Sequence, residues 1–238
     1  MLSIRHFFPE FNTWIESIPD PRFRPFVVYD SKFLFWWAVS LFLFKLGSRR
    51  QLDFHFNTDG PAVLANLNRL AGTAQETRPV NQTMNYYLGR IGSEEVAGVR
   101  TKRVNRLIRM KVLDEARLQG RFVVATDGTG YLVFNYRHCD HCLTQTHGDK
   151  TVYMHQVLEA KILGPADTVI SMASEFIDNR DSAASAASAS VEQRKQDCEL
   201  KALRRLGAKM RQVFPQLRLC WSGDGLFACG EGFQISKD

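Results

Sequence analysis

The stretch VVATDGTGYLVFNYRHCDHCLTQTHGD (residues 123–149) starts as an apolar run, breaks off at Asp127 and continues through a glycine turn into two cysteines and three histidines. A short apolar run of this kind is typical of a central strand. Two β-rich runs follow at 152–163 and 168–177, with the turn Gly164-Pro165 between them. A helix at 192–214 and a last apolar run at 217–221 complete the pattern, so residues 121–238 predict an α/β fold.

The order of these elements predicts how the strands pair. The first three are joined closely enough to be antiparallel, whereas the helix returns the chain so that the fourth strand lies parallel to the first. Parallel neighbours end at the same edge of a sheet, and these two strands end at Asp127 and Asp224. The expected sheet is therefore mixed, with three antiparallel strands, a helix and a parallel fourth strand.

The two aspartates have two interpretations. Each is followed by glycine, and Asp-Gly is a common turn dipeptide, so either residue alone is more readily a turn former. As a pair, two carboxylates at one sheet edge repel each other, and a divalent cation with oxygen ligands would compensate for that repulsion. On this second interpretation we expect the carboxylates of Asp127 and Asp224 within roughly 4 to 8 Å, close enough to share metal ions.

Residues 1–120 predict an all-helical domain. The apolar run at 33–44 would form a helix of roughly 18 Å, too short for a hydrocarbon core of roughly 30 Å, and is interpreted as a buried helix rather than a membrane span. Pro61 opens another helix, and two more meet around Gly92. The second domain covers 121–238, and its Ser/Ala-rich segment at 182–190 is expected to be a flexible loop.

The helix that follows Gly92 carries a basic face. Six of the twelve residues from 100 to 111 are basic and none is acidic. They are Arg100, Lys102, Arg103, Arg106, Arg109 and Lys111. Like charges at this spacing are tolerated on many solvated helices, but DNA would relieve their repulsion and release counterions. Both interpretations remain open, and a net charge of +6 with an isoelectric point near 9.2 is consistent with a polyanionic partner.

The CxxC pair of Cys139 and Cys142 lies among several histidines. Thiolate and imidazole are the preferred ligands of zinc, and a CxxC lets one turn supply two of four ligands. The expected set is Cys139, Cys142 and His147, with a fourth ligand from His155 or His138. Free thiols in a polar loop are the main alternative. A redox pair is disfavoured because such a CxxC opens a helix after a strand, and this one lies in a hairpin excursion.

Several motifs together resemble the bacterial insertion-sequence transposases of the DDE type, whose catalytic core is RNase H-like. They are VVATDGTGYLVF, HCDHC, VYMHQVLEAKIL, EFIDN, KQDCELKALRRL and LCWSGDGLF, with IPDPRFRP and the apolar helix before the core. The resemblance covers most of the chain. It implies that Asp127 and Asp224 are the first two acids of the catalytic triad and bind Mg²⁺ or Mn²⁺, and that the partner is double-stranded DNA at transposon ends.

The third acid of that family is a glutamate on a helix well after the second aspartate, and no residue up to Asp238 matches it. Glu199 lies on the helix between the third and fourth strands, and that helix can offer a carboxylate to the metal site in RNase H-like enzymes generally. We interpret it as an auxiliary candidate, although a surface glutamate paired with Lys or Arg is the simpler interpretation. We therefore expect a C-terminally truncated core that binds DNA in a salt-sensitive way without metal-dependent cleavage.

The leading expectation for the function is DNA transposition, by metal-dependent strand cleavage and joining in the complete protein. An RNase H-like nuclease would cleave without joining, and a non-catalytic remnant would only bind DNA. A zinc-organised interaction module would leave the paired aspartates unexplained. Five cysteines, an odd number, and the lack of a signal peptide indicate a reducing cytoplasm. There the protein would associate with the nucleoid when bound to DNA, and a homodimer is one candidate assembly.

Overall fold

The computed structural model describes residues 2–58, 60–179 and 197–237, and the chain divides into two compact units at Arg103/Val104. This boundary lies earlier than the predicted one near residue 120. The reason is that the end of the basic helix belongs to the core of the second unit: Val104 is fully buried there, and Leu107 and Ile108 pack against the same cluster.

The first unit is helical, as predicted. Its elements are α1 (Leu2–Phe7), α2 (Phe11–Glu16), η1 (Arg24–Phe26), α3 (Ser31–Leu43), α4 (Arg49–Thr58), α5 (Gly60–Ala71), α6 (Asn81–Leu88) and the first part of α7 (Ser93–Arg109). Helix α3 begins where the Asp30 side chain accepts a hydrogen bond from the Lys32 backbone N–H at 2.8 Å. The predicted burial holds for its first turns, where Phe33, Trp36 and Trp37 enter the core.

The far end of α3 differs from that prediction, because Phe42 is 77% exposed. No helix in the described part of the chain is both long and apolar enough to cross a membrane.

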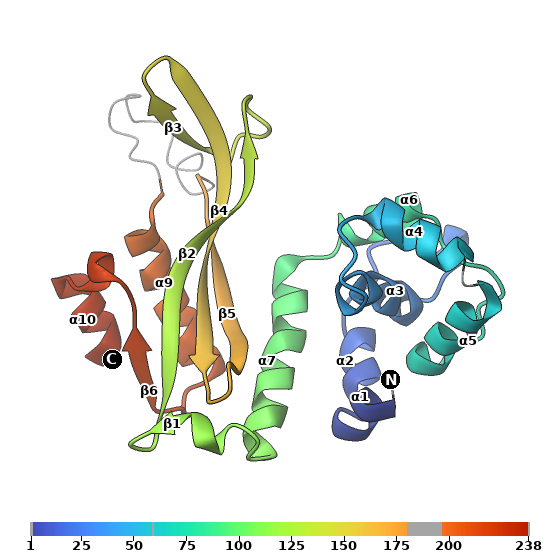
Figure 1. The fold of residues 1–238 in the computed structure, drawn as a ribbon, viewed down its shortest axis with the longest axis horizontal. Helices are drawn as coiled ribbons and strands as arrows, with labels where there is room; N and C mark the ends of the chain where they lie inside the picture. The colour runs from blue at the N-terminus through green and yellow to red at the C-terminus, as the bar shows by residue number, and fades with distance from the viewer. Residues whose placement is uncertain (1, 59, 180–196, 238) are drawn as a thin grey trace. The chain divides into compact units, whose positions relative to one another are not determined.

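The second unit is a mixed α/β structure built on one six-stranded sheet. Its elements are η2 (Asp114–Ala116), β1 (Arg117–Leu118), β2 (Arg121–Phe134), β3 (Leu143–His147), β4 (Lys150–Leu163), β5 (Val169–Ile177), α9 (Glu199–Val213), β6 (Leu219–Ser222), η4 (Gly225–Phe227) and α10 (Gly230–Lys237). Figure 1 shows β2 and β4 as the two long central strands, with α9 and α10 near β6. The predicted Ser/Ala-rich loop at 182–190 and the predicted start of the last helix at 192 lie outside the described residues.

Strand pairing follows the predicted order. β2 pairs antiparallel with β4, and β4 pairs antiparallel with β5. β6 then pairs with β2 in parallel, from Phe122 opposite Leu219 to Ala125 opposite Ser222. β1 and β3 are additional short strands, which pair antiparallel with β2 and β4.

The prediction that the first strand ends at Asp127 is wrong. β2 continues to Phe134, and Asp127 lies in its middle with Glu159 as its partner on β4. The glycines at 128 and 130 indicated a turn, but pairing with the long strand β4 overrides their weak strand propensity. The register shifts between Gly130 and Leu132, so that Tyr131 is an extra residue, a β-bulge.

The core of the second unit lies between the sheet and helix α9. Phe122 and Val124 of β2 are fully buried, as are Leu158, Ala160 and Ile162 of β4. Helix α9 packs its apolar stripe against this surface. The buried residues of that stripe are Ala202, Leu203, Leu206, Gly207 and Met210. This packing fixes where the first residue of α9, Glu199, meets the sheet.

Candidate functional site

Asp127 is an exposed side chain on β2 with a second carboxylate directly opposite. Its partner across the antiparallel pair is Glu159, and side chains of directly opposite residues lie on the same face of a sheet. The Lys161 ammonium group lies 3.0 Å from the Glu159 carboxylate and compensates for part of this negative charge. Asp127 therefore lies on an acidic part of the sheet surface.

Asp224 follows the last residue of β6. The parallel pairing of β6 with β2 ends at Ser222 opposite Ala125, and continuing that register by two residues brings Asp224 level with Asp127. The Asp224 side chain also caps η4, since its Oδ1 accepts a hydrogen bond from the Leu226 backbone N–H at 3.0 Å. Asp224 thus forms the turn that follows β6, the strand that pairs with β2.

Glu199 is the third carboxylate, at the start of α9. Its side chain lies over Gly128, the neighbour of Asp127: a Cβ added at Gly128 would come within 2.3 Å of the Glu199 Oε1. Burial raises the pKa of Glu199 above its ordinary value, and the nearby charges of Asp224 and Asp127 raise it further. Each of the two aspartates is therefore close enough to Glu199 to disfavour its charged form.

The three carboxylates form a loose group rather than a closed one. Within the residues that the structure describes, the group whose metal-binding atoms all lie within 4.8 Å of one another is a His/Cys group, not this one. Mg²⁺ suits such an open arrangement, because it keeps several water molecules and binds through a few carboxylates together with substrate phosphates. Asp127, Glu199 and Asp224 are thus the residues suited to hold Mg²⁺ or Mn²⁺.

The start of α9 is fixed by an ion-pair network around Asp197. Its carboxylate binds the guanidinium of Arg205, at 2.6 Å for the shortest contact, and accepts a hydrogen bond from the Asp178 backbone N–H at 3.1 Å. Arg205 also binds Glu175 on β5 at 2.7 Å. Although its partial burial acts to lower the pKa of Arg205, its hydrogen bonds to both carboxylates raise it overall. Asp197 thus ties the chain just before α9 to the end of β5.

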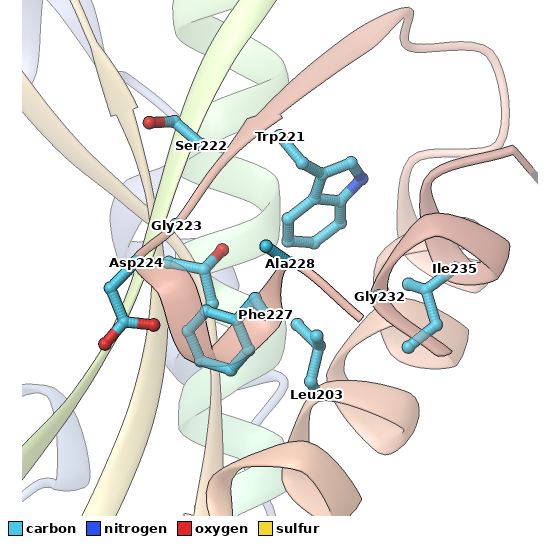
Figure 2. A pocket seen from close by; sticks show the side chains of 10 residues that line it. Leu203, Trp221, Ser222, Gly223, Asp224, Phe227, Ala228, Gly232 and Ile235 are labelled. Atoms are coloured by element: carbon cyan, nitrogen blue, oxygen red, sulfur yellow. The ribbon is translucent and has the colours of Figure 1, made fainter. Parts of the chain in front are cut away.

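An apolar cavity of about 190 Å³ adjoins Asp224. Leu203, Trp221, Phe227 and Ile235 form most of its wall, and Figure 2 shows the Asp224 carboxylate pointing away from the side chains of Leu203 and Ile235. An apolar wall of this kind does not suit a phosphate group. The cavity therefore borders Asp224 but offers mainly apolar contacts.

The Cys/His cluster is the most compact group of metal-binding side chains in the described residues. The Cys139 and Cys142 sulfurs lie 3.7 Å apart, and each lies 3.4 Å from the His155 Nε2. The binding atoms of His138, Cys139 and His155 all lie within 4.8 Å of one another. The two sets of three share Cys139 and His155, with Cys142 in one set and His138 in the other.

The prediction that His147 belongs to this cluster is wrong. His147 ends β3 and is paired with Lys150, five residues before His155 on β4. Because a strand rises about 3.3 Å per residue, Lys150 and His155 are roughly 17 Å apart. Residue spacing alone suggested His147, whereas the register of the β3–β4 hairpin places it at the far end and leaves His138 and His155 as the histidines of the cluster.

The basic residues of α7 are less exposed than they would be on a helix face that lies wholly in solvent. Lys102, Arg109 and Lys111 are exposed, whereas Arg100, Arg103 and Arg106 are partly buried. Burial lowers the pKa of Arg103. Lys102 donates a hydrogen bond to the Ser17 hydroxyl at 3.0 Å. The fully exposed positive charge on α7 therefore comes from fewer residues than the six basic positions suggested.

Comparisons with family models, with curated proteins and with solved structures find no match to this chain. The case for a function accordingly rests on the motifs of the sequence and on the geometry described above.

Proposed function

We propose that this chain is the DNA-processing part of a DDE-type transposase with an RNase H-like core, which cleaves and joins DNA phosphodiesters with Mg²⁺ or Mn²⁺. The observation that carries the proposal is the place of three carboxylates from three separate elements: Glu199 of α9 lies over Gly128, next to Asp127, and Asp224 follows the strand that pairs with β2. The pairing of β6 parallel to β2 supports the same core.

In this proposal the chain's own residues position the reaction. Asp127 and Asp224 would hold the ions, and Glu199, whose side chain lies in the space that Gly128 leaves open, would add a ligand from α9. When bound, the ions supply an activated attacking hydroxyl and stabilise the leaving oxygen. Water, and then a DNA 3′-hydroxyl, attacks the phosphorus in line; one P–O bond forms, the bond to the 3′-oxygen breaks, and that oxygen leaves with a proton from solvent.

Glu199 changes one expectation. Two aspartates without a third acid predicted no cleavage, but Glu199 supplies a third carboxylate from within the chain. The proposal therefore includes metal-dependent nicking by the chain as it stands. The bond-breaking step needs all three groups, since each fixes part of the ion coordination.

Nicking of supercoiled plasmid in Mg²⁺ or Mn²⁺ tests the catalytic part. We expect Asp127→Asn, Glu199→Gln and Asp224→Asn each to lose roughly 100-fold or more of the nicking rate, since even the outer partners of metal ligands cost up to about that factor. Asp149→Asn, at an exposed position next to the turn between β3 and β4, is the control and should nick like the parent chain. Equal rates for the parent and Asp127→Asn would reject the proposal.

Joining separates a transposase from a nuclease. Pre-cleaved DNA ends with a free 3′-hydroxyl should be transferred into a target plasmid by the parent chain. Nicking without any transfer would instead support an RNase H-like nuclease.

A non-catalytic DNA-binding remnant is the second candidate, and the capping of η4 by Asp224 favours it, since that hydrogen bond gives the residue a structural role.

DNA binding itself is tested by a salt series on a chain with Lys102, Arg103, Arg106 and Arg109 changed to Gln. Each lost phosphate contact should reduce the salt slope by about 1. An unchanged slope would remove α7 from the DNA interface, whereas a reduced slope with no nicking would support the remnant.

A further inference from the structure

We propose that His138, Cys139, Cys142 and His155 bind one structural zinc ion. The distances carry this assignment. Zinc in tetrahedral coordination, with Zn–S about 2.3 Å and Zn–N about 2.0 to 2.1 Å, holds two thiolates about 3.8 Å apart and a thiolate and an imidazole about 3.5 Å apart. The observed separations are 3.7 Å between the sulfurs and 3.4 Å from each sulfur to His155 Nε2.

His138 is the fourth ligand. It belongs with Cys139 and His155 to the group whose binding atoms lie within 4.8 Å of one another. Its ring stacks on Phe134 at the end of β2, with ring centres 4.6 Å apart and an interplanar angle of 10°. That stacking holds the imidazole beside the cluster, much as outer partners orient the ligands of known metal sites.

Other uses of two cysteines fit less well. A disulfide needs sulfurs about 2.05 Å apart, well below the 3.7 Å observed. A redox CxxC lies at the start of a helix, where the helix lowers the thiol pKa, but Cys139 and Cys142 lie in the connection between β2 and β3. One imidazole between two sulfurs, with a second imidazole nearby, is instead the donor set that zinc prefers.

The zinc ion would fasten the β2–β3 connection to strand β4, and hydrogen bonds extend that attachment to α9. Asn179, just after β5, donates from its side chain to the Cys142 carbonyl at 3.0 Å and from its backbone to the His141 carbonyl at 3.2 Å. Its side-chain oxygen accepts from the Asp197 backbone N–H at 3.1 Å. Asp197 is two residues before Glu199, so the zinc cluster supports the chain that leads into the carboxylate group.

Metal content and cobalt substitution test the ligand set. Protein purified without chelator should carry about one zinc per chain, and the Co²⁺ form should show the absorption of a tetrahedral site with two thiolates. Cys142→Ser, His155→Gln and His138→Gln should each lose most of the zinc. His147→Gln and Cys198→Ser are the matched controls and should keep it. A parent chain with less than about 0.2 zinc, or a His138→Gln chain with unchanged zinc and cobalt spectrum, would overturn the assignment.

Hydrogen exchange tests the connection to α9 without any measurement of activity. Removing zinc from the parent chain should speed exchange at the Asn179 and Asp197 amides, whereas the amides in the middle of α9 should change little. Equal exchange at Asp197 with and without zinc would refute the supporting role. Zinc binding does not depend on the proposed DNA chemistry, so Glu199→Gln should keep its zinc whether or not the parent chain nicks DNA.

Discussion

The carboxylate group and the Cys/His cluster are built differently. Glu159, opposite Asp127, and His155 are four residues apart on β4, or roughly 13 Å. The cluster takes three of its four side chains from the short connection between β2 and β3. The carboxylates come from β2, α9 and the turn after β6, and they remain apart.

The difference follows from the charge of the side chains. Thiols and imidazoles can be neutral and hydrogen-bond one another, so they can pack closely together. Charged carboxylates repel one another, and burial together with the charges of Asp224 and Asp127 raises the pKa of Glu199. A compact Cys/His cluster and a looser group of carboxylates are therefore both what this chemistry predicts.

The largest expected effect separates the two groups by the metal that each is proposed to bind. Removing zinc with a chelator should lower the free energy of unfolding of the second unit by on the order of 5 kcal/mol, since structural zinc contributes directly to folding. Removing Mg²⁺ alone should lower it by less than about 1 kcal/mol. Thermal melts of the parent chain, with Cys142→Ser as the zinc-free reference, measure both. Equal shifts for the two metals would break the comparison.

A smaller effect is expected at Gly128. In Gly128→Ala the new methyl group would come within 2.3 Å of the Glu199 Oε1, the end of a flexible side chain that can move aside, so we expect little loss of stability but loss of most nicking activity, with zinc retained. Gly130→Ala is the matched control on the same strand, because nothing lies within 4 Å of a Cβ there. Chemical denaturation and plasmid nicking measure the pair; similar behaviour of both variants would show that Glu199 does not need this space.

Asn179 connects the Cys/His cluster to the chain that leads into the carboxylate group, so its loss should affect that connection. Asn179→Ala removes its side-chain hydrogen bonds with the Cys142 carbonyl and the Asp197 N–H, at a cost of about 1 to 2 kcal/mol. We expect zinc content to stay the same while the Mg²⁺ concentration for half-maximal nicking rises. If nicking in Mg²⁺ is unchanged, the two groups are independent.

The smallest effect concerns the pH dependence of Glu199. Its pKa is raised in the folded chain, so between its ordinary value of 4.5 and the raised value the folded state holds a proton that the unfolded state releases. Stability conferred by this group is therefore lost as pH rises through that window. Without Mg²⁺, Glu199→Gln should melt slightly higher than the parent chain at pH 7 and equally at pH 3.5, roughly one unit below the ordinary pKa. A lower melting temperature for Glu199→Gln at pH 7 would contradict the crowding of the three charges.

Sequence reasoning reached the parts of the site that depend on element order. The parallel pairing of β6 with β2 follows from counting strands and one helix. Glu199 was an auxiliary candidate, but sequence reasoning could not place its side chain, because no local pattern reveals that it lies over Gly128. Sequence reasoning also missed Glu159, which only the register of β2 with β4 places opposite Asp127.

The Cys/His cluster shows the same division. The CxxC spacing identified two sulfurs, because that spacing is local. Excluding His147 required the register of the β3–β4 hairpin, which depends on long-range pairing. The Asn179–Asp197 hydrogen bond joins residues on both sides of a segment for which composition alone predicts only a loop.

The bulge at Tyr131 has a consequence for how β2 and β4 can vary. Before the bulge, Asp127 is paired with Glu159; after it, Leu132 is paired with His155. On β2, the side chains on the Asp127 face are therefore those of odd-numbered residues before the bulge and of even-numbered residues after it. The extra residue at Tyr131 therefore separates two stretches of regular alternation in β2. A residue can be inserted or deleted at the bulge without moving the side chains of either stretch to the opposite face of the sheet. The acidic group and the cysteine-bearing loop can in this way change their sequences independently while sharing the same pair of strands.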